Sequence, residues 1–181
     1  MSIKNSEIKE LIAELGSKKE VQKVEAIKKI IAYMQVGKDV SSLFFPVMKC
    51  LELQNIEIKK LVYLYIIQYS RQRPDDAIMV IASFVKDATN KSNPLVRALA
   101  VRTMGCLRVK NLNTYLIDPL SQALKDTDPY VKKTAVMSVP KVYELTPELV
   151  EQHKLIEEVQ SILNKDTNSV VIANTILALE E

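Results

Sequence analysis

Apolar residues recur along this chain at the spacing of α-helices almost throughout. In the segment 59–69, KKLVYLYIIQY, the large side chains at i, i+4, i+5 and i+8 form a wide stripe on one helix face: Leu61, Tyr65, Ile66 and Tyr69. The sequence contains no uninterrupted run of 18 apolar residues, so none of these helices is predicted to cross a membrane. The pattern therefore predicts an all-α protein built of amphipathic helices.

Prolines mark where most of these helices are expected to begin. Proline suits the first turn of a helix, because its missing N–H would have no intrahelical partner there. Four prolines each follow a residue whose side chain can cap a helix: Asn93-Pro94, Asp118-Pro119, Asp128-Pro129 and Thr146-Pro147. Pro74, followed by two aspartates, predicts a fifth helix start. Gly37 is expected to end the helix before it, and Pro140 to kink or end the helix that contains it.

The helices are organised as a repeat. Three segments share an opening turn followed by a valine and a small residue: NPLVRALAVRTMG, DPYVKKTAVMSVP and NSVVIANTILALE. Alignment of five repeats gives spacings of 36, 38, 35 and 40 residues between Lys23/Ala26, Lys59/Val62, Arg97/Ala100, Lys132/Ala135 and Ile172/Thr175. Units of about 34–47 residues are typical of solenoids. We predict one α-solenoid over residues 1–181, with about five helical hairpins and ten helices. Because its last hairpin has no polar capping repeat after it, we expect a piece of a longer protein.

The composition argues against an enzyme. Only 3 glycines occur, too few for glycine-rich nucleotide-binding turns or for a β-sandwich. The sequence has no phosphate-binding loop, Gly-x-Ser-x-Gly, Cys-x-x-Cys or His-Glu-x-x-His motif, and its single histidine, His153, stands among charged residues. Cys50 and Cys106 are interpreted as reduced, buried thiols. Asp126 and Asp128 are interpreted as helix caps rather than metal ligands. We expect a soluble, cytosolic protein with no catalysis, metal or cofactor.

Charge is unevenly distributed along the chain. Residues 1–110 carry 19 Lys and Arg against 11 Asp and Glu, whereas residues 111–181 carry 6 against 11. The early basic residues are Lys18, Lys19, Lys23, Lys28 and Lys29, and the pair Lys59-Lys60 follows one repeat later. If equivalent positions align, these residues form a ridge that attracts anionic lipid at about 1 kcal/mol per lysine. The alternative, which composition favours, is an ordinary solvated helix face mixed with glutamates.

Two apolar clusters each have two interpretations. The segment PDDAIMVIASFV is apolar over most of its circumference from Ala77 to Val85, which is typical of a buried helix. If one side is open, Ile78, Ile81 and Val85 form a patch at i, i+3 and i+7 for a partner. The tyrosines Tyr63, Tyr65 and Tyr69 are expected between helices with their hydroxyls at the core edge, rather than as a base-stacking platform.

Several segments resemble one protein family. VGKDVSSLF (36–44), IKKLVYLYI (58–66), FVKDATNKSNPLVRALAVRTMGCLRV (84–109) and LKDTDPYVKKTAV (124–136) are similar to the N-terminal trunk of a β-adaptin. A β-adaptin is the large β subunit of a heterotetrameric clathrin adaptor complex of the trans-Golgi or plasma-membrane type. The similarity runs from about Ser6 to Leu179. It implies an armadillo/HEAT-like α-solenoid and covers the first part of the trunk, without the later trunk, the hinge or the ear.

The resemblance also implies a function and a set of partners. We expect a non-catalytic subunit that acts in vesicle-mediated protein transport, peripheral on coated membranes at the trans-Golgi network, endosome or plasma membrane. The implied partners are a second large chain, a medium chain, a small chain, an Arf-family GTPase and a phosphoinositide-containing membrane. Clathrin binding is implied only for family regions that this sequence does not contain, and no nucleic acid is expected.

Two sets of residues match contact positions of the family. In the trans-Golgi form, active Arf docks on apolar residues after a Gln-x-Pro-Asp turn, where this sequence has Ile78 and Ile81. In the plasma-membrane form, early basic residues meet phosphoinositide, and the matching lysines are Lys19, Lys23, Lys28 and Lys29, with uncharged and acidic residues interrupting them. The alternative function is a free-standing helical-repeat scaffold that binds protein or nucleic-acid backbone. Backbone binding would require a shared face for Arg71, Arg73, Arg97, Arg102 and Arg108.

Overall fold

The structure, a computed structural model, describes residues 3–181. Contacts between residues divide the chain into two compact units, Met1–Gln72 and Arg73–Glu181. Every element in the described residues is an α-helix or a short 3₁₀ helix, which confirms the all-α prediction.

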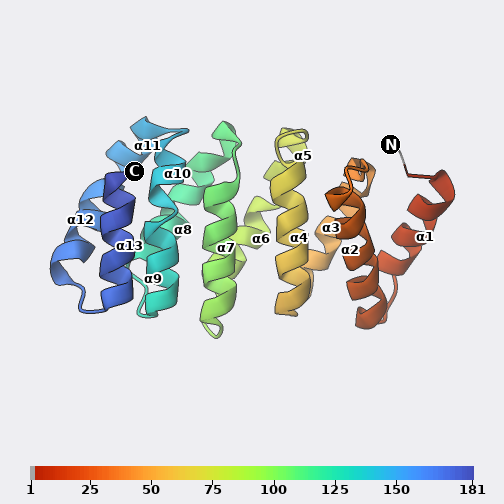
Figure 1. Cartoon of the computed structure of the whole chain (residues 1–181), viewed down its shortest axis with the longest axis horizontal. Coiled ribbons are helices and arrows are strands. Elements are labelled where there is room, and N and C mark those ends of the chain that lie inside the picture. The colour runs from red at the N-terminus through yellow and green to blue at the C-terminus, as the bar shows by residue number, and fades with distance from the viewer. Residues whose placement is uncertain (1–2) are drawn as a thin grey trace. The chain divides into compact units, whose positions relative to one another are not determined.

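The first unit contains two helical hairpins. In the first, α1 (Asn5–Leu15) packs on α2 (Glu20–Gln35). In the second, η1 (Ser41–Leu43), α3 (Phe44–Met48) and η2 (Lys49–Glu52) form an irregular arm that packs on α4 (Ile56–Tyr69). α2 and α4 lie side by side (Figure 1). The core contains the fully buried side chains Ile27, Ile30, Phe44, Val62, Tyr65 and Ile66.

The second unit contains nine α-helices and one 3₁₀ helix: α5 (Pro74–Ile78), α6 (Ile81–Ala88), α7 (Pro94–Cys106), η3 (Lys110–Leu112), α8 (Asn113–Leu124), α9 (Pro129–Val136), α10 (Val139–Tyr143), α11 (Pro147–Gln152), α12 (Leu155–Lys165) and α13 (Ser169–Glu180). The helices of this unit stack in two layers. α8 contacts both α6 and α12 in one layer, and α9 contacts both α7 and α13 in the other (Figure 1). Because each helix also packs on its hairpin partner, this is the architecture of an α-solenoid.

Across residues 3–181 the structure has thirteen α-helices, more than the ten predicted. The excess arises because several predicted helices are broken into two: α5 and α6, α9 and α10, and α11 and α12.

The repeat register derived from the sequence is confirmed. The five aligned small or β-branched residues are all fully buried, each in the second helix of its hairpin: Ala26, Val62, Ala100, Ala135 and Thr175. A small side chain at these positions lets the neighbouring helix approach closely, as the alignment predicted.

Most predicted helix starts are also confirmed. α5, α7, α9 and α11 begin at Pro74, Pro94, Pro129 and Pro147. The side chains of Asn93 and Asp128 accept hydrogen bonds from the two backbone N–H groups that follow the proline, which completes the predicted caps. Asn168 caps α13 in the same way, although a serine replaces the proline there.

The start predicted at Pro119 is wrong. α8 begins at Asn113 and runs through Pro119 to Leu124. Leu116 and Ile117, just before the proline, are 1% exposed, and Leu120 after it is 4% exposed. Burial of apolar side chains on both sides of the proline therefore outweighs the one helical hydrogen bond that the proline cannot donate.

Glycine and proline end two helices as predicted. Gly37 has φ +75°, and the N–H groups of Gly37 and Lys38 donate to the carbonyls of Met34 and Tyr33, which together close the end of α2. Pro140 lies in the first turn of α10, and α9 ends before it at Val136. The predicted interruption by Pro140 is therefore confirmed.

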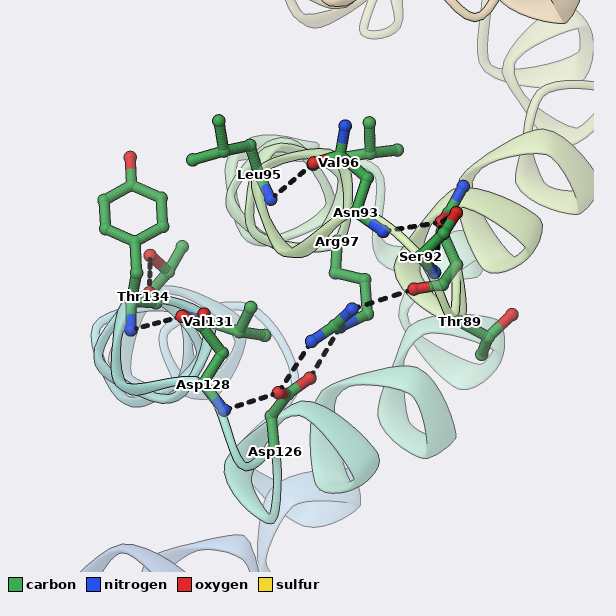
Figure 2. Close-up of polar contacts among 12 residues, drawn as sticks. Thr89, Ser92, Asn93, Leu95, Val96, Arg97, Asp126, Asp128, Val131 and Thr134 are labelled. Atoms are coloured by element: carbon green, nitrogen blue, oxygen red, sulfur yellow. Dashed lines mark hydrogen bonds and ion pairs between the residues drawn. The ribbon is translucent and has the colours of Figure 1, made fainter.

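A polar contact links successive hairpins of the second unit. Arg97 of α7 points at Asp126, which lies in the loop before α9, and its Nε and Nη2 donate to the carboxylate at 2.7 and 2.9 Å (Figure 2). The next repeat places Lys132 at the aligned position, and its Nζ pairs with Asp166, in the loop before α13, at 2.5 Å. We call these two ion pairs the inter-repeat latches.

Each latch aspartate also accepts a backbone hydrogen bond. The N–H groups of Asp128 and Asn168 donate to Asp126 and Asp166, both at 2.9 Å. Burial acts to raise the pKa of Asp126, but the hydrogen bonds from Arg97 and Asp128 outweigh it and hold the pKa below its usual value. The hydrogen bond from Lys132 lowers the pKa of Asp166. Asp128 is therefore the helix cap that the sequence predicted, whereas the same interpretation is wrong for Asp126, whose carboxylate pairs with Arg97 and accepts from the N–H of Asp128 before the helix begins.

Candidate interaction sites

The apolar segment proposed for GTPase contact is not one continuous helix. α5 ends at Ile78 and α6 begins at Ile81, since the N–H groups of Met79 and Val80 bond three residues back and turn the chain. The side chain of Ile78 is 49% exposed, but that of Ile81 is 7% exposed. The conditional patch at i, i+3 and i+7 therefore does not form, because the turn rotates Ile81 into the core.

A different pair of apolar side chains is exposed at this turn. Met79, 62% exposed, stands beside Ile78. Asp75 and Asp76 precede them in α5, and Arg73 pairs with Asp76 at 3.1 Å. We call Ile78 and Met79 the α5 knuckle: a small apolar surface with charged residues on one side.

The four lysines proposed for membrane contact all lie at or in α2. Lys19 is the residue before the helix, and Lys23 is in its first turn. Lys28 pairs with Glu57 of α4 at 2.8 Å, and Lys29 pairs with Glu14 of α1 at 2.8 Å. Successive helix residues point about 100° apart, so these two lysines reach in different directions, one toward α4 and the other toward α1.

The predicted continuous ridge of ammonium groups is wrong for its second repeat. Lys59 is 1% exposed, and its Nζ donates to the Leu51 carbonyl at 2.7 Å. Its charge is therefore enclosed in the first unit. In the two α2 ion pairs, the hydrogen bond that Lys29 donates to Glu14 raises the pKa of Lys29, and the hydrogen bond that Lys28 donates to Glu57 lowers the pKa of Glu57.

The tyrosines of α4 lie in the core, as expected, but two of their hydroxyls are not at its edge. Tyr65 donates to the Val40 carbonyl at 2.6 Å, and the Val40 N–H donates to the Tyr69 hydroxyl at 3.2 Å. The two phenols thus hold both backbone polar groups of one buried residue. Tyr63 is also buried, 1% exposed.

The two cysteines and the single histidine differ in their exposure. Cys50 is buried, which raises the pKa of its thiol, and Cys106 is half-buried. His153 is exposed and directly follows the last residue of α11. Within residues 3–181, no three His, Cys, Asp or Glu side chains are grouped so as to hold a metal ion. In the same described residues, no helix is both long and apolar enough to cross a membrane.

Sequence reasoning missed a groove of about 240 Å³ in the second unit. Its lining comes from α7, α9, α10, α13 and the turn between α9 and α10: Arg102, Tyr130, Lys133, Thr134, Met137, Ser138, Lys141 and Asn174. All the charged residues in this lining are basic. The available signal was the absence of Asp and Glu from three of these helices, which whole-segment charge totals conceal.

The chain belongs to a known family. Residues 2–181 match the family described as the adaptin N terminal region. The chain is 51% identical over 178 residues to the AP-1 complex subunit beta of Dictyostelium discoideum, covering 98% of this chain and 19% of that protein. It is 50% identical to the AP-1 complex subunit beta-1 of Homo sapiens, covering 98% and 18%. The chain thus spans about a fifth of the length of these curated relatives.

Solved structures support the fold. A homology model of the full-length AP-3 complex matches with a TM-score of 0.70 and 23% identity, covering 98% of this chain and 28% of that chain. A designed armadillo repeat protein in complex with the peptide (KR)4 matches with a TM-score of 0.66 and 19% identity, covering 94% and 79%. The α-solenoid predicted from the repeats is confirmed, as is the armadillo-like form that the family resemblance implies.

Proposed function

We propose that this chain is part of a non-catalytic β subunit of an adaptor complex that acts in vesicle-mediated protein transport. The observation that carries the proposal is about 50% identity to AP-1 β subunits over 98% of the chain. A stacked-helix scaffold suits this function, because it offers long surfaces to several partners at once. The partners in the proposal are a second large chain, a medium chain and a small chain.

Assembly tests the proposal directly. Co-expression of the full gene product with these three chains from the same organism should give one species that co-elutes in size-exclusion chromatography. Separate elution of the gene product and an assembled remainder would contradict the proposal.

We place contact with an active Arf-family GTPase at the α5 knuckle. Exposure of Ile78 and Met79 supports it, since exposed apolar side chains next to polar ones are typical of transient interfaces. Ile81 is buried, so it can contribute to this contact only through the packing that holds the turn between α5 and α6. Ile78→Asp should abolish GTP-dependent capture of Arf by the assembled complex. The matched control is Leu95→Asp, at another exposed apolar residue of the same unit, which should leave capture unchanged. Equal capture by both variants would refute this contact.

We assign the lysines of α2 a weak contribution to binding of phosphoinositide-containing membranes. Lys19, Lys28 and Lys29 are exposed, so each can approach a lipid surface, although two of them must exchange a glutamate for a headgroup. Co-sedimentation with vesicles should weaken when Lys28 and Lys29 are reversed to glutamate. Unchanged binding would show that these lysines form only an ordinary solvated helix face.

A further inference from the structure

Three helices of the second unit carry positive charge only. α7, α9 and α10 contain no Asp or Glu, and their basic residues are Arg97, Arg102, Lys132, Lys133 and Lys141. α13, which packs on α9, has a single acid, Glu180, at its last residue. α7, α9 and α10 therefore supply no carboxylate to these five cations, and α13 carries one only at its last residue.

The five cations fall into two groups. Arg97 and Lys132 are neutralised by the latch aspartates. The other three, Arg102, Lys133 and Lys141, all line the groove of about 240 Å³. None of these three has an ion pair with an acid in the described residues. Three positive charges that share one concave surface raise its potential more than the same charges spread over a convex one.

Two of the three groove cations make contacts with uncharged side chains. Lys133 Nζ lies 4.8 Å from the centre of the Tyr130 ring, and Lys141 Nζ lies 3.8 Å from Cys106 Sγ. Neither contact neutralises an ammonium charge. The groove therefore presents charge to an incoming ligand without first having to break an ion pair.

Three other polar side chains of the groove keep acceptor atoms that are not used within the chain. The hydroxyls of Thr134 and Ser138 donate to the carbonyls of Tyr130 and Thr134, so their lone pairs remain for a ligand. Asn174 uses one amide N–H on the Val170 carbonyl and keeps its carbonyl oxygen. Acceptors suit a ligand that has N–H donors as well as negative charge. A peptide has both, whereas a phosphate ion or a lipid headgroup such as phosphatidylserine's phosphate offers no such row of N–H groups.

We propose that this groove binds an extended acidic peptide segment of a partner protein. Carboxylates of the peptide pair with Arg102, Lys133 and Lys141, and its backbone N–H groups donate to Thr134, Ser138 and Asn174. The proposed peptide binding uses residues of neither the α5 knuckle nor the α2 lysines, and it does not require the other adaptor chains. Its failure is therefore distinguishable from failure of the adaptor function.

Fluorescence anisotropy with the full chain tests the proposal. The probe is a fluorescein-labelled peptide of alternating Asp and Glu, and its Asn and Gln counterpart is the neutral control. Arg102→Glu with Lys141→Glu should weaken binding of the acidic probe by at least about tenfold. The neutral variant Arg102→Gln with Lys141→Gln should weaken binding of the acidic probe less. It replaces the charge-reversal variant if melting curves show that charge reversal disturbs folding.

The matched control is Lys86→Glu with Lys110→Glu. These lysines are exposed, lie outside the groove and produce the same change in net charge. The control should bind the acidic probe nearly as well as the unaltered chain. Equal weakening by both double variants would overturn the proposal, because attraction would then depend on net charge alone. A different result would also overturn the proposal: the acidic peptide does not bind, but vesicles that contain anionic lipid do, and charge reversal in the groove abolishes the vesicle binding. The groove would then be a membrane site.

Discussion

The Arg97–Asp126 latch gives the sharpest stability prediction. The two side chains are 14% and 12% exposed, and the guanidinium makes two bonds to the carboxylate and a third, at 2.9 Å, to the Asn90 carbonyl. An exposed ion pair contributes less than about 1 kcal/mol, whereas loss of one partner of a fully buried pair costs about 3–5 kcal/mol. This pair lies between those limits. We expect Asp126→Asn to lower the free energy of unfolding by about 1.5 kcal/mol and the melting temperature by about 4 °C.

A double-mutant cycle isolates the latch. Arg97→Met keeps most of the aliphatic stem, and the double variant Arg97→Met with Asp126→Asn should lose about 1 kcal/mol less than the sum of the single losses. Glu144→Gln is the control, since its pair with Arg108 is about half exposed and should cost less than about 0.5 kcal/mol. Urea unfolding of all variants measures these differences. A coupling energy below about 0.3 kcal/mol would refute the account of the latch.

The latch also predicts acid sensitivity. The pKa of Asp126 is lower in the folded chain than in the unfolded chain, so its contribution to stability is complete above the unfolded pKa of about 3.9 and is lost as the pH falls through the folded value. The unaltered chain should therefore lose stability below about pH 4 more steeply than Asp126→Asn does. Parallel pH profiles would show that the folded carboxylate is not perturbed.

Three further perturbations follow from burial and close contacts. Gly105→Ala should destabilise the second unit by about 2 kcal/mol, because an added Cβ would lie 2.8 Å from Ser138 Cβ; an unchanged melting temperature would contradict that packing. Ile81→Asp should unfold or strongly destabilise the chain, whereas Ile78→Asp should change its stability by less than about 0.5 kcal/mol in thermal melts; equal effects would show that the assigned burial is wrong. Lys28→Glu and Lys29→Glu should each shift the urea unfolding midpoint much less than Ile81→Asp does, because both lysine side chains are about half exposed, and an equal shift would contradict their assignment as surface ion pairs.

The sequence predicted the repeat because its signals are local and repeated. Asn93 and Asp128 precede prolines, and small residues such as Ala100 and Ala135 recur at a fixed distance from them. Each of these features has one favourable structural explanation, so the helix starts and buried positions could be derived without an alignment.

The failures concern positions that tertiary contacts decide. Pro119 has a capping residue before it and would begin a helix in isolation, but its buried neighbours extend α8 through it. Ile81 has the same periodicity as Ile78, and only the turn between α5 and α6 separates a buried side chain from an exposed one. The basic groove joins residues from four helices, and no short segment of sequence contains that arrangement.

Affinity purification of the tagged full-length gene product from its own cytosol, followed by mass spectrometry, tests the central claim most directly. The account predicts recovery of a second large adaptor chain, a medium chain and a small chain in comparable amounts. Their identity would also assign the complex to the trans-Golgi or plasma-membrane type. Recovery of the gene product without these chains would contradict the adaptor function and leave a helical-repeat protein with another partner.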